Sequence, residues 1–402
     1  MIFGEWIYAC FLVGAALVHW FLPARARSWW LAACGLAFYA YYSEAFLWLI
    51  VAEIALVLLL VREARRHAWA YGLALAATLG ALVVFKYGGL LARTLGVAAA
   101  RVDLPPLPDF PRLVLPLAIS FFTFEFVHYI VDARAGKLPE HTPSEFFAFA
   151  LFFPTMVAGP IKRFQAFKPQ IASSKASAQD LNDGITRIAV GLAKKLCIAD
   201  TLTPLTLPLL TTEAMRSASR EQLAIALLAF SVKIYMDFSG YSDIAIGSAR
   251  LFGIHVPENF NWPYLRANIA QFWRHWHMSL TSWITDYVYI PLGGSRRGLG
   301  LTAINSVIAM AVSGLWHGAQ WHFLAWGLYH GVMLAAYRIW TEVAKRPLAD
   351  RFPSLATGLL GGVTRVAGGA IGIAATFVLV TLGWGLFVMP VERFTEMIGR
   401  LL

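Results

Sequence analysis

The chain has 402 residues, of which 58% are hydrophobic and only 14% charged, and its mean hydropathy is +0.61. A soluble domain carries about 25% charged residues, so the composition excludes an ordinary soluble domain and indicates a polytopic membrane protein. The formal net charge is +10, and the lysines and arginines lie mostly in loops between apolar runs. The sequence has no basic stripe and no RNA- or DNA-binding motif, which argues against a nucleic-acid partner.

The N-terminal third predicts a series of membrane-spanning helices. A span needs about 20 apolar residues, and the candidates are 5–22, 28–42, 45–61, 69–87 and 112–131. The first run carries Glu5 and has its arginines after the apolar residues, which favours a retained helix over a signal peptide. The positive-inside rule then places the basic loops 62–67 and 132–145 in the cytoplasm and the proline-rich loop 88–111 outside.

The apolar segment 146–161 does not fit a single span, because basic loops flank it on both sides. Pro154, Gly159 and Pro160 also interrupt it. We therefore expect a re-entrant segment that is surrounded by protein or water and forms the wall of a cavity open to the cytoplasm.

The rest of the chain alternates short polar segments with apolar ones. We expect a polar linker at 173–183, and one oblique or interfacial helix at 267–290, which is too polar to span. The remaining helices are predicted at 184–199, 221–238, 242–253, 301–316, 319–337 and 366–388. This pattern predicts about nine to eleven spans with both termini outside.

Six of the ten histidines lie between residues 237 and 330, where the polar and aromatic residues are densest. His317 follows a predicted span, between Gly314 and Gly318, whose missing side chains allow close approach of other groups. A neutral imidazole at that depth can take a proton from a hydroxyl, as a general base for acyl transfer must. The alternative is a histidine that packs among tryptophans and is hydrogen-bonded to a carbonyl.

His277 lies 40 residues before His317, so the two belong to different elements and could face one cavity. It could polarise an acyl carbonyl or orient an acceptor. His275, two residues away, is expected on another face of the helix, as an interfacial residue.

Three aspartates, Asp237, Asp243 and Asp286, accompany these histidines. Buried carboxylates need partners, and we expect structural ion pairs, with Arg274 or Lys233 as the available cations. A metal site is not predicted, because the histidines at 317, 322 and 330 do not share a clean helical face and no H-E-x-x-H motif is present. The sequence also lacks the G-x-S-x-G motif of serine hydrolases.

These segments resemble the membrane-bound O-acyltransferase (MBOAT) family, in particular its bacterial branch for alginate O-acetylation and D-alanyl transfer. The resemblance covers nearly the whole chain. It is carried by FFTFEFVHYIVDARAG, FFPTMVAGPIKRFQAFKPQ, DFSGYSDIAIGSARLFGIHVPENFNWPY, FWRHWHMSLTSWITDYVYIPLGG and GLWHGAQWHFLAWGLYHG, in the family's order and spacing. The position of His275 departs from the family, which usually has arginine there, so a donor contact at that position is not implied.

The resemblance implies an all-α fold, a ring of tilted helices in which a cytoplasmic tunnel for the acyl donor meets an outer funnel for the acceptor. It implies one integral-membrane domain over 1–402, with N-terminal helices at 1–111, a catalytic core at 112–341 and a C-terminal helix region at 342–402. His317 matches the family's catalytic histidine and His277 its second active-site histidine. Residues expected to line the tunnel or to support the site are Trp316, Asp237, Tyr241, Asp243, Arg274, Trp276, Asp286 and Asn305.

The leading hypothesis is an O-acyltransferase of the bacterial inner membrane. It would pass an acyl group, preferably acetyl, from a cytoplasmic thioester (acetyl-CoA or an acyl carrier protein) towards an exported polysaccharide, with an extracytoplasmic partner completing the transfer. No permanently bound cofactor or metal is expected. The alternatives are D-alanyl transfer from a carrier protein to a cell-envelope polymer and, in another class, a non-catalytic transporter of an acyl donor or glycan.

Overall fold

A computed structural model describes residues 5–103, 110–111, 113–173, 177–345, 347 and 358–402. The described residues form helices and loops without a β-strand, so the chain is an all-α polytopic membrane protein. It divides into two compact units, one made of Met1–Ala193 and Gly240–Glu258 and the other of Lys194–Ser239 and Asn259–Leu402. One long helix contributes to both units.

The first unit contains the N-terminal helices. They are α1 (Trp6–Phe21), α2 (Ala24–Ser43), η2 (Glu44–Phe46), α3 (Leu47–Ala64), α4 (Ala68–Leu82), η3 (Val83–Tyr87), α5 (Gly88–Ala100), α6 (Ile119–Arg134), α7 (Pro143–Ala150), α8 (Phe153–Met156), α9 (Phe164–Ser173), α10 (Ala178–Ala193) and the second part of α12 (Arg220–Arg250).

The second unit begins after α10 and carries the C-terminal helices. They are η4 (Lys194–Ala199), η5 (Pro204–Leu209), α11 (Thr212–Ser217), the first part of α12, η6 (Pro263–Leu265), α13 (Ile269–His275), α14 (Met278–Ile284), η7 (Thr285–Tyr289), α15 (Leu299–His317), α16 (Trp321–Trp340), η8 (Thr341–Lys345), α18 (Gly358–Val388) and α19 (Val391–Leu401).

Helices of membrane-spanning length and composition occur in both units. Five in the described part of the chain qualify, namely Ala24–Ala64, Ala68–Ala100, Arg220–Arg250, Leu299–His317 and Val366–Val388. The helices predicted at 28–42 and 45–61 form one apolar stretch, joined by the short turn η2. The number of spans and the orientation of the termini stay predictions.

Three predictions of local structure are wrong. Residues 88–100, expected in an outer loop, form α5, because their alanines and leucines favour helix despite three glycines. The predicted polar linker at 173–183 is shorter, since α10 begins at Ala178. The helices expected at 221–238 and 242–253 are a single helix, α12, which continues through Gly240.

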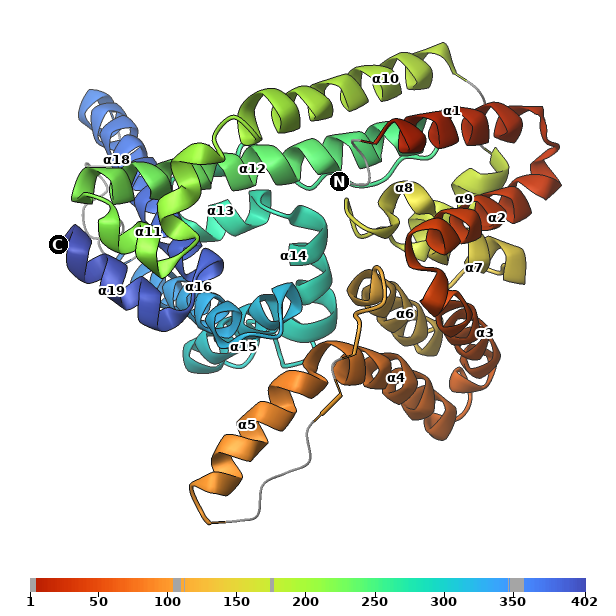
Figure 1. The fold of residues 1–402 in the computed structure, drawn as a ribbon, viewed down its shortest axis with the longest axis horizontal. Helices are drawn as coiled ribbons and strands as arrows, with labels where there is room; N and C mark the ends of the chain where they lie inside the picture. The colour runs from red at the N-terminus through yellow and green to blue at the C-terminus, as the bar shows by residue number, and fades with distance from the viewer. Residues whose placement is uncertain (1–4, 104–109, 112, 174–176, 346, 348–357) are drawn as a thin grey trace. The chain divides into compact units, whose positions relative to one another are not determined.

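Glycines explain why α12 stays helical at Gly240. A methyl group on Gly191 would lie 2.6 Å from the Gly240 oxygen, and one on Gly184 would lie 2.9 Å from the Gly247 oxygen. Gly184 and Gly191 are seven residues apart on α10, and Gly240 and Gly247 are seven residues apart on α12. The two helices therefore lie side by side with their backbones in contact (Figure 1). Close packing of this kind offsets the cost of about 1 kcal/mol that a glycine imposes inside a helix.

The interrupted segment predicted at 146–161 is present in the first unit. Two short helices, α7 and α8, are separated by a turn, and the chain leaves α8 without helix before α9. Phe146, Phe149, Phe152 and Phe153 are fully buried among other residues of the unit, and Gly159 has φ +115°, which favours glycine. The segment is thus broken and enclosed by protein, as expected, while its membrane topology stays a prediction.

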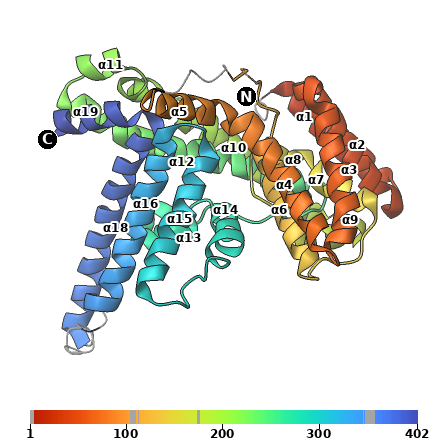
Figure 2. The same cartoon turned by 90° about the horizontal axis from the view of Figure 1, so that it is seen from below.

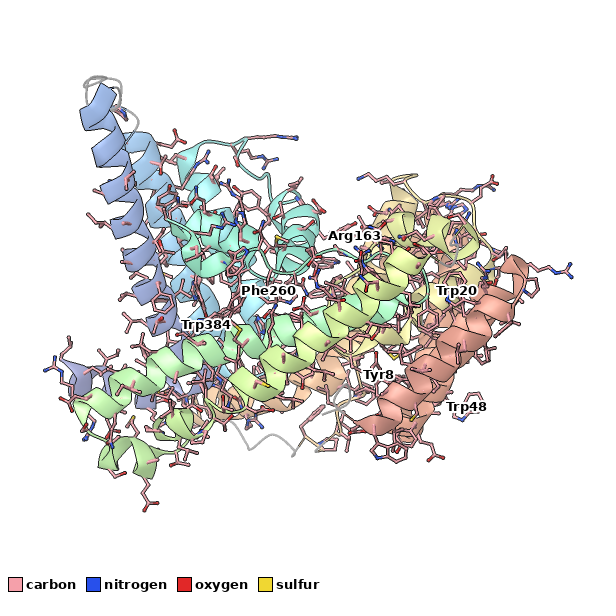
Figure 3. The ribbon with its side chains drawn as sticks, turned by 90° about the horizontal axis from the view of Figure 1, so that it is seen from above. Tyr8, Trp20, Trp48, Arg163, Phe260 and Trp384 are labelled. Atoms are coloured by element: carbon pink, nitrogen blue, oxygen red, sulfur yellow. The ribbon has the colours of Figure 1, made fainter. Side chains whose placement is uncertain are left out.

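An aromatic cluster forms the core of the second unit. The helices α15, α16 and α18 run alongside one another (Figure 2), and α13 packs against α16 and α18. The ring of Trp276 lies 4.9 Å from that of Trp384 and 5.0 Å from that of Phe260, and both of these residues are labelled in Figure 3. Such edge-to-face and tilted pairs add about 0.5–1.5 kcal/mol each to the gain from burial. This core holds the elements that carry the two histidines.

Candidate functional site

His277 lies at a break between two helices of the second unit. We expected one helix at 267–290; the structure instead ends α13 at His275 and begins α14 at Met278. Trp276 is extended, and His277 has φ +45° and ψ +53°, a left-handed conformation that is uncommon for a residue with a side chain. Such a conformation costs roughly 1–2 kcal/mol and occurs often at functional sites.

His317 is the last residue of the 19-residue helix α15, one residue beyond the end of the span predicted at 301–316. The flanking glycines allow close packing: a methyl group on Gly314 would lie 2.2 Å from the Phe323 oxygen, and one on Gly318 would lie 2.2 Å from the Phe323 ring. The imidazole is partly exposed and lies edge-on to Trp326 and Phe387, with ring centroids 5.1 and 5.0 Å away. The start of α16 therefore fixes the end of α15 and, with it, the position of His317.

The indole of Trp316 links the two histidines. Its ring centroid lies 5.7 Å from that of His277 and 4.7 Å from that of His317. The two imidazoles thus belong to one cluster, although 40 residues separate them along the chain. They lie on different elements, as the sequence predicted, and their shared role in one site stays a prediction.

Asn259 holds the buried imidazole of His277, which is only 1% exposed. The Asn259 Oδ1 atom lies 3.3 Å from His277 Nδ1 and accepts hydrogen bonds from Ser279 Oγ at 2.6 Å and Ser279 N at 3.4 Å. The Met278 amide also donates to the backbone oxygen of Asn259, at 2.9 Å. Asn259, in the loop before α13, is therefore hydrogen-bonded to three consecutive residues at the helix break, namely 277, 278 and 279.

These hydrogen bonds assign the tautomer of His277. Because Asn259 Oδ1 accepts from both donors of Ser279, it is an acceptor towards the imidazole as well, so Nδ1 carries the proton. The Nε2 atom then presents a lone pair, and it makes no hydrogen bond with any residue that the structure describes. His277 can accept a hydrogen bond from a bound group at this atom.

Burial keeps His277 in that neutral form. The residue lies outside the five candidate spans. Burial is the larger cause, and the neighbouring His317 the smaller, of a pKa held well below the usual value for histidine. Near neutral pH, His277 is therefore available as a hydrogen-bond acceptor.

A cavity of about 280 Å³ lies one helical turn from both histidines. Ser313, one turn before His317, lines it, and so does Thr281, whose amide donates to the His277 oxygen at 2.9 Å. The other lining residues are Ala270, Trp273, Arg274, Leu280, Ile284, Thr285, Tyr289, Ser306, Ala309, Met310 and Leu334. Arg274 is exposed at this cavity, which is otherwise mainly apolar with a few hydroxyl groups.

The other predicted residues of the second unit have structural positions. Trp276 belongs to the aromatic core. Asn305 is buried in α15 and donates through Nδ2 to the carbonyl oxygens of Leu292 and Gly294, at 3.3 and 3.0 Å, so it holds the loop before α15. Asp286 is exposed on η7 rather than buried.

Asp237 and Asp243 form ion pairs, as expected, but with different cations. Asp237 Oδ1 lies 2.9 Å from Lys195 Nζ in the second unit, and Asp243 Oδ1 lies 2.6 Å from Arg187 Nε in the first. The expected partners are wrong because η4 and α10, rather than α13, bring a cation to each carboxylate. Among the described residues no ion pair is formed by Arg274 or Lys233.

Two of the predicted residues do not belong to the unit that carries the histidines. Tyr241 and Asp243 belong to the first unit, where Tyr241 packs against the core, whereas the histidines belong to the second. Sequence reasoning missed Asn259 and Ser279, which hold His277. The only signal for Asn259 was its place in the motif PENFNWPY, which the resemblance included without assigning a role to this residue.

The sequence is similar to one family model and to several curated bacterial proteins. Residues 120–380, which contain both histidines, match the model of the membrane-bound O-acyltransferase family. The chain is 34% identical over 330 residues to the probable alginate O-acetylase AlgI of Azotobacter vinelandii, covering 80% of this chain and 65% of that protein. It is 31% identical over 376 residues to the peptidoglycan O-acetyltransferase of Helicobacter pylori, covering 84% and 70%.

A further relative transfers a different acyl group, according to its name. The chain is 32% identical over 257 residues to the teichoic acid D-alanyltransferase of Bacillus subtilis, covering 60% of this chain and 64% of that protein. The chain spans between about half and two thirds of the length of the AlgI relatives, from 54% to 65%.

Proposed function

The chain belongs to the membrane-bound O-acyltransferase family, and from that premise we propose that it is a membrane-embedded O-acyltransferase. It moves an acyl group, preferably acetyl, from a cytoplasmic thioester for O-acylation of an exported cell-surface polysaccharide such as alginate, cellulose or a peptidoglycan-like polymer. One observation carries this proposal: His277 and His317 adjoin Trp316, and the Nε2 atom of His277 is left without a partner among the described residues.

The reaction needs a base and an oriented hydroxyl. The acceptor oxygen attacks the thioester carbonyl, the new C–O bond forms, the C–S bond breaks, and His317 takes the hydroxyl proton and returns it to the leaving thiolate. Of the two roles considered for His277, the tautomer set by Asn259 favours orientation, since Nε2 accepts a hydrogen bond and does not donate one to a carbonyl.

The donor is proposed to reach the histidines through the cavity beside them. That cavity is narrow, mainly apolar and lined by hydroxyl groups of Thr281, Ser306 and Ser313. A thioester arm has alternating apolar and amide groups, which such a wall accommodates. Acetyl-CoA or an acyl carrier protein would then be substrate, and the transfer requires no permanently bound cofactor.

The remaining parts of the proposal concern location and partners. We place the chain in the bacterial inner membrane with both termini outside, on the basis of its loop charges. An extracytoplasmic acyltransferase partner or the polysaccharide itself accepts the acyl group. The alternative acyl group is D-alanyl, which the resemblance to the D-alanyltransferases supports. A non-catalytic transporter of an acyl donor or glycan is the alternative of another class.

The experiment uses the full chain in nanodiscs with radiolabelled acetyl-CoA or, separately, a D-alanyl-loaded carrier protein, and follows release of the thiol. Wild type is compared with His317→Ala and with Arg338→Gln, a control on the far end of α16. Turnover of acetyl-CoA that only His317→Ala loses supports acetyl transfer, and turnover with the carrier alone assigns D-alanyl transfer. Equal turnover in all three proteins would refute the role of His317.

A further inference from the structure

A second cavity lies in the first unit, and none of the residues that line it was assigned above to acyl transfer. It has a volume of about 540 Å³ and is formed by the end of α3, the later part of α6 and the residues that lead into α7. The residues that line it are Leu58, Val61, Arg62, Glu63, Arg65, Arg66, Tyr129, Glu140, His141 and Pro143.

The guanidinium groups of three arginines at this cavity form no ion pair with any residue that the structure describes. Arg62, Arg65 and Arg66 are exposed, and none of their side chains forms an ion pair or hydrogen bond with a residue that the structure describes. Two carboxylates also line the cavity. Glu63 Oε2 lies 3.6 Å from His67 Nε2, and Glu140 adds a single negative charge to the three positive charges of the arginines. The cavity therefore presents guanidinium groups in excess, and these bind phosphate oxygens in a bidentate manner.

The rest of the wall is apolar or satisfied internally. Leu58 and Val61 come from the last turns of α3, at the end of a helix of membrane-spanning composition, and Val61 is only 2% exposed. Tyr129 Oη lies 2.6 Å from His141 Nε2, and His141 Nδ1 lies 2.9 Å from the Pro139 oxygen. A ligand at this site thus meets a few apolar side chains together with the exposed guanidinium groups.

The position of the cavity relative to the membrane follows from the loops that form it. Residues 62–67 and 132–145 were both predicted to be cytoplasmic from their charge, and the structure brings parts of both loops to the same cavity. A basic cavity at the cytoplasmic end of a spanning helix is a site for the headgroups of anionic lipids.

We propose that this cavity binds a phosphate ester, with the arginines on the phosphate and the apolar wall along the attached chain. An anionic phospholipid of the cytoplasmic leaflet supplies both parts of such a ligand. A soluble phosphate ester, such as the phosphoadenosine part of coenzyme A, supplies the phosphate alone. Neither source depends on the acyltransferase proposal, because none of the lining residues belongs to the histidine cluster.

The test measures retained lipid by native mass spectrometry of the full chain. The protein is extracted from nanodiscs that contain phosphatidylglycerol and phosphatidylcholine, and it is compared with Arg62→Gln/Arg65→Gln. We expect wild type to retain phosphatidylglycerol and the double variant to retain on the order of tenfold less. A parallel arm measures binding of coenzyme A to the same two proteins in phosphatidylcholine nanodiscs.

A matched control removes two exposed arginines from another loop, with Arg296→Gln/Arg297→Gln. Selective loss of phosphatidylglycerol in the first variant identifies a lipid site, and selective loss of coenzyme A binding identifies a site for a soluble phosphate ester. Equal retention in all proteins, or equal loss in both double variants, overturns the proposal. Arg62→Lys/Arg65→Lys, which keeps the charge but loses the bidentate geometry, should retain more binding than the glutamine variant and less than wild type, and it shows whether the first variant fails only through misfolding.

Discussion

The two histidines of the site have opposite local settings. His317 ends a regular helix, α15, that the apolar pattern predicted to within a few residues, whereas His277 occupies a left-handed break that the pattern did not predict. His317 is held by backbone packing through glycines, and His277 by the side chains of Asn259 and Ser279. A regular helix that the apolar pattern reveals can position a candidate site residue, whereas the break that holds His277 needs hydrogen bonds from residues elsewhere in the chain.

The largest expected effect follows from removal of the proposed base. His317→Ala should lower the turnover of the acyl thioester by roughly 10²- to 10⁴-fold, the range for loss of general acid–base catalysis. Thiol release by the full chain in nanodiscs measures it, with unchanged elution of the variant on gel filtration as the folding control. A loss below about fivefold would mean that His317 is a packed histidine without a role in the reaction.

Asn259 should affect turnover by positioning His277. Asn259→Ala removes the acceptor for His277 Nδ1 and for Ser279, so the tautomer is no longer fixed, and we expect a loss of roughly tenfold in turnover, from a penalty of about 1–3 kcal/mol for unpaired buried groups. Asn259→Asp keeps an acceptor oxygen and adds a negative charge beside the imidazole.

The aspartate variant has a distinct pH dependence. A carboxylate at position 259 favours the protonated imidazole, so it raises the pKa of His277, which burial holds low in the wild type. Protonation removes the Nε2 lone pair, so turnover should fall at a higher pH than in the wild type as the pH is lowered. A pH profile that matches the wild type, with only a uniform decrease in turnover, would assign Asn259 a merely structural role.

The sequence predicted the regular parts of this molecule and missed the parts that depend on contacts distant in the chain. Apolar runs located α1, α3, α15 and α16 because a spanning helix must satisfy its backbone internally. The same rule cannot reveal that Gly240 continues a helix, since Gly191 on another helix makes that possible. It also cannot reveal that Asn259 holds His277.

The ion pairs show the same limit. The aspartates at 237 and 243 were expected to be paired, since buried carboxylates need partners. Their cations, Lys195 and Arg187, lie 42 and 56 residues before them in the sequence, and only the packing of helices selects them over nearer cations.

Packing around α15 gives a smaller effect, on stability. A methyl group at Gly314 would lie 2.2 Å from the Phe323 oxygen, so Gly314→Ala must displace the start of α16 and should lower the free energy of unfolding by about 1–3 kcal/mol. Gly300→Ala, on the same helix with nothing within 4 Å, is the matched control and should be neutral or slightly stabilising. Thermal unfolding in one detergent compares them; similar melting temperatures would mean that α16 adjusts freely.

The smallest expected effect is the difference in stability between a glycine and an alanine variant at each histidine. This difference should have opposite signs at positions 277 and 317, so it distinguishes the two settings directly. Alanine and glycine both remove the imidazole, so each pair of variants differs only in one methyl group and in backbone freedom. At φ +45° the methyl group is unfavourable, and His277→Gly should be more stable than His277→Ala by about 1 kcal/mol. At the helical position of His317 alanine is preferred, and His317→Ala should be more stable than His317→Gly by up to about 1 kcal/mol. Four melting temperatures in one detergent decide the matter. The same order at both positions would show that the break at His277 is not a left-handed residue, and the contrast between the two settings would then fail.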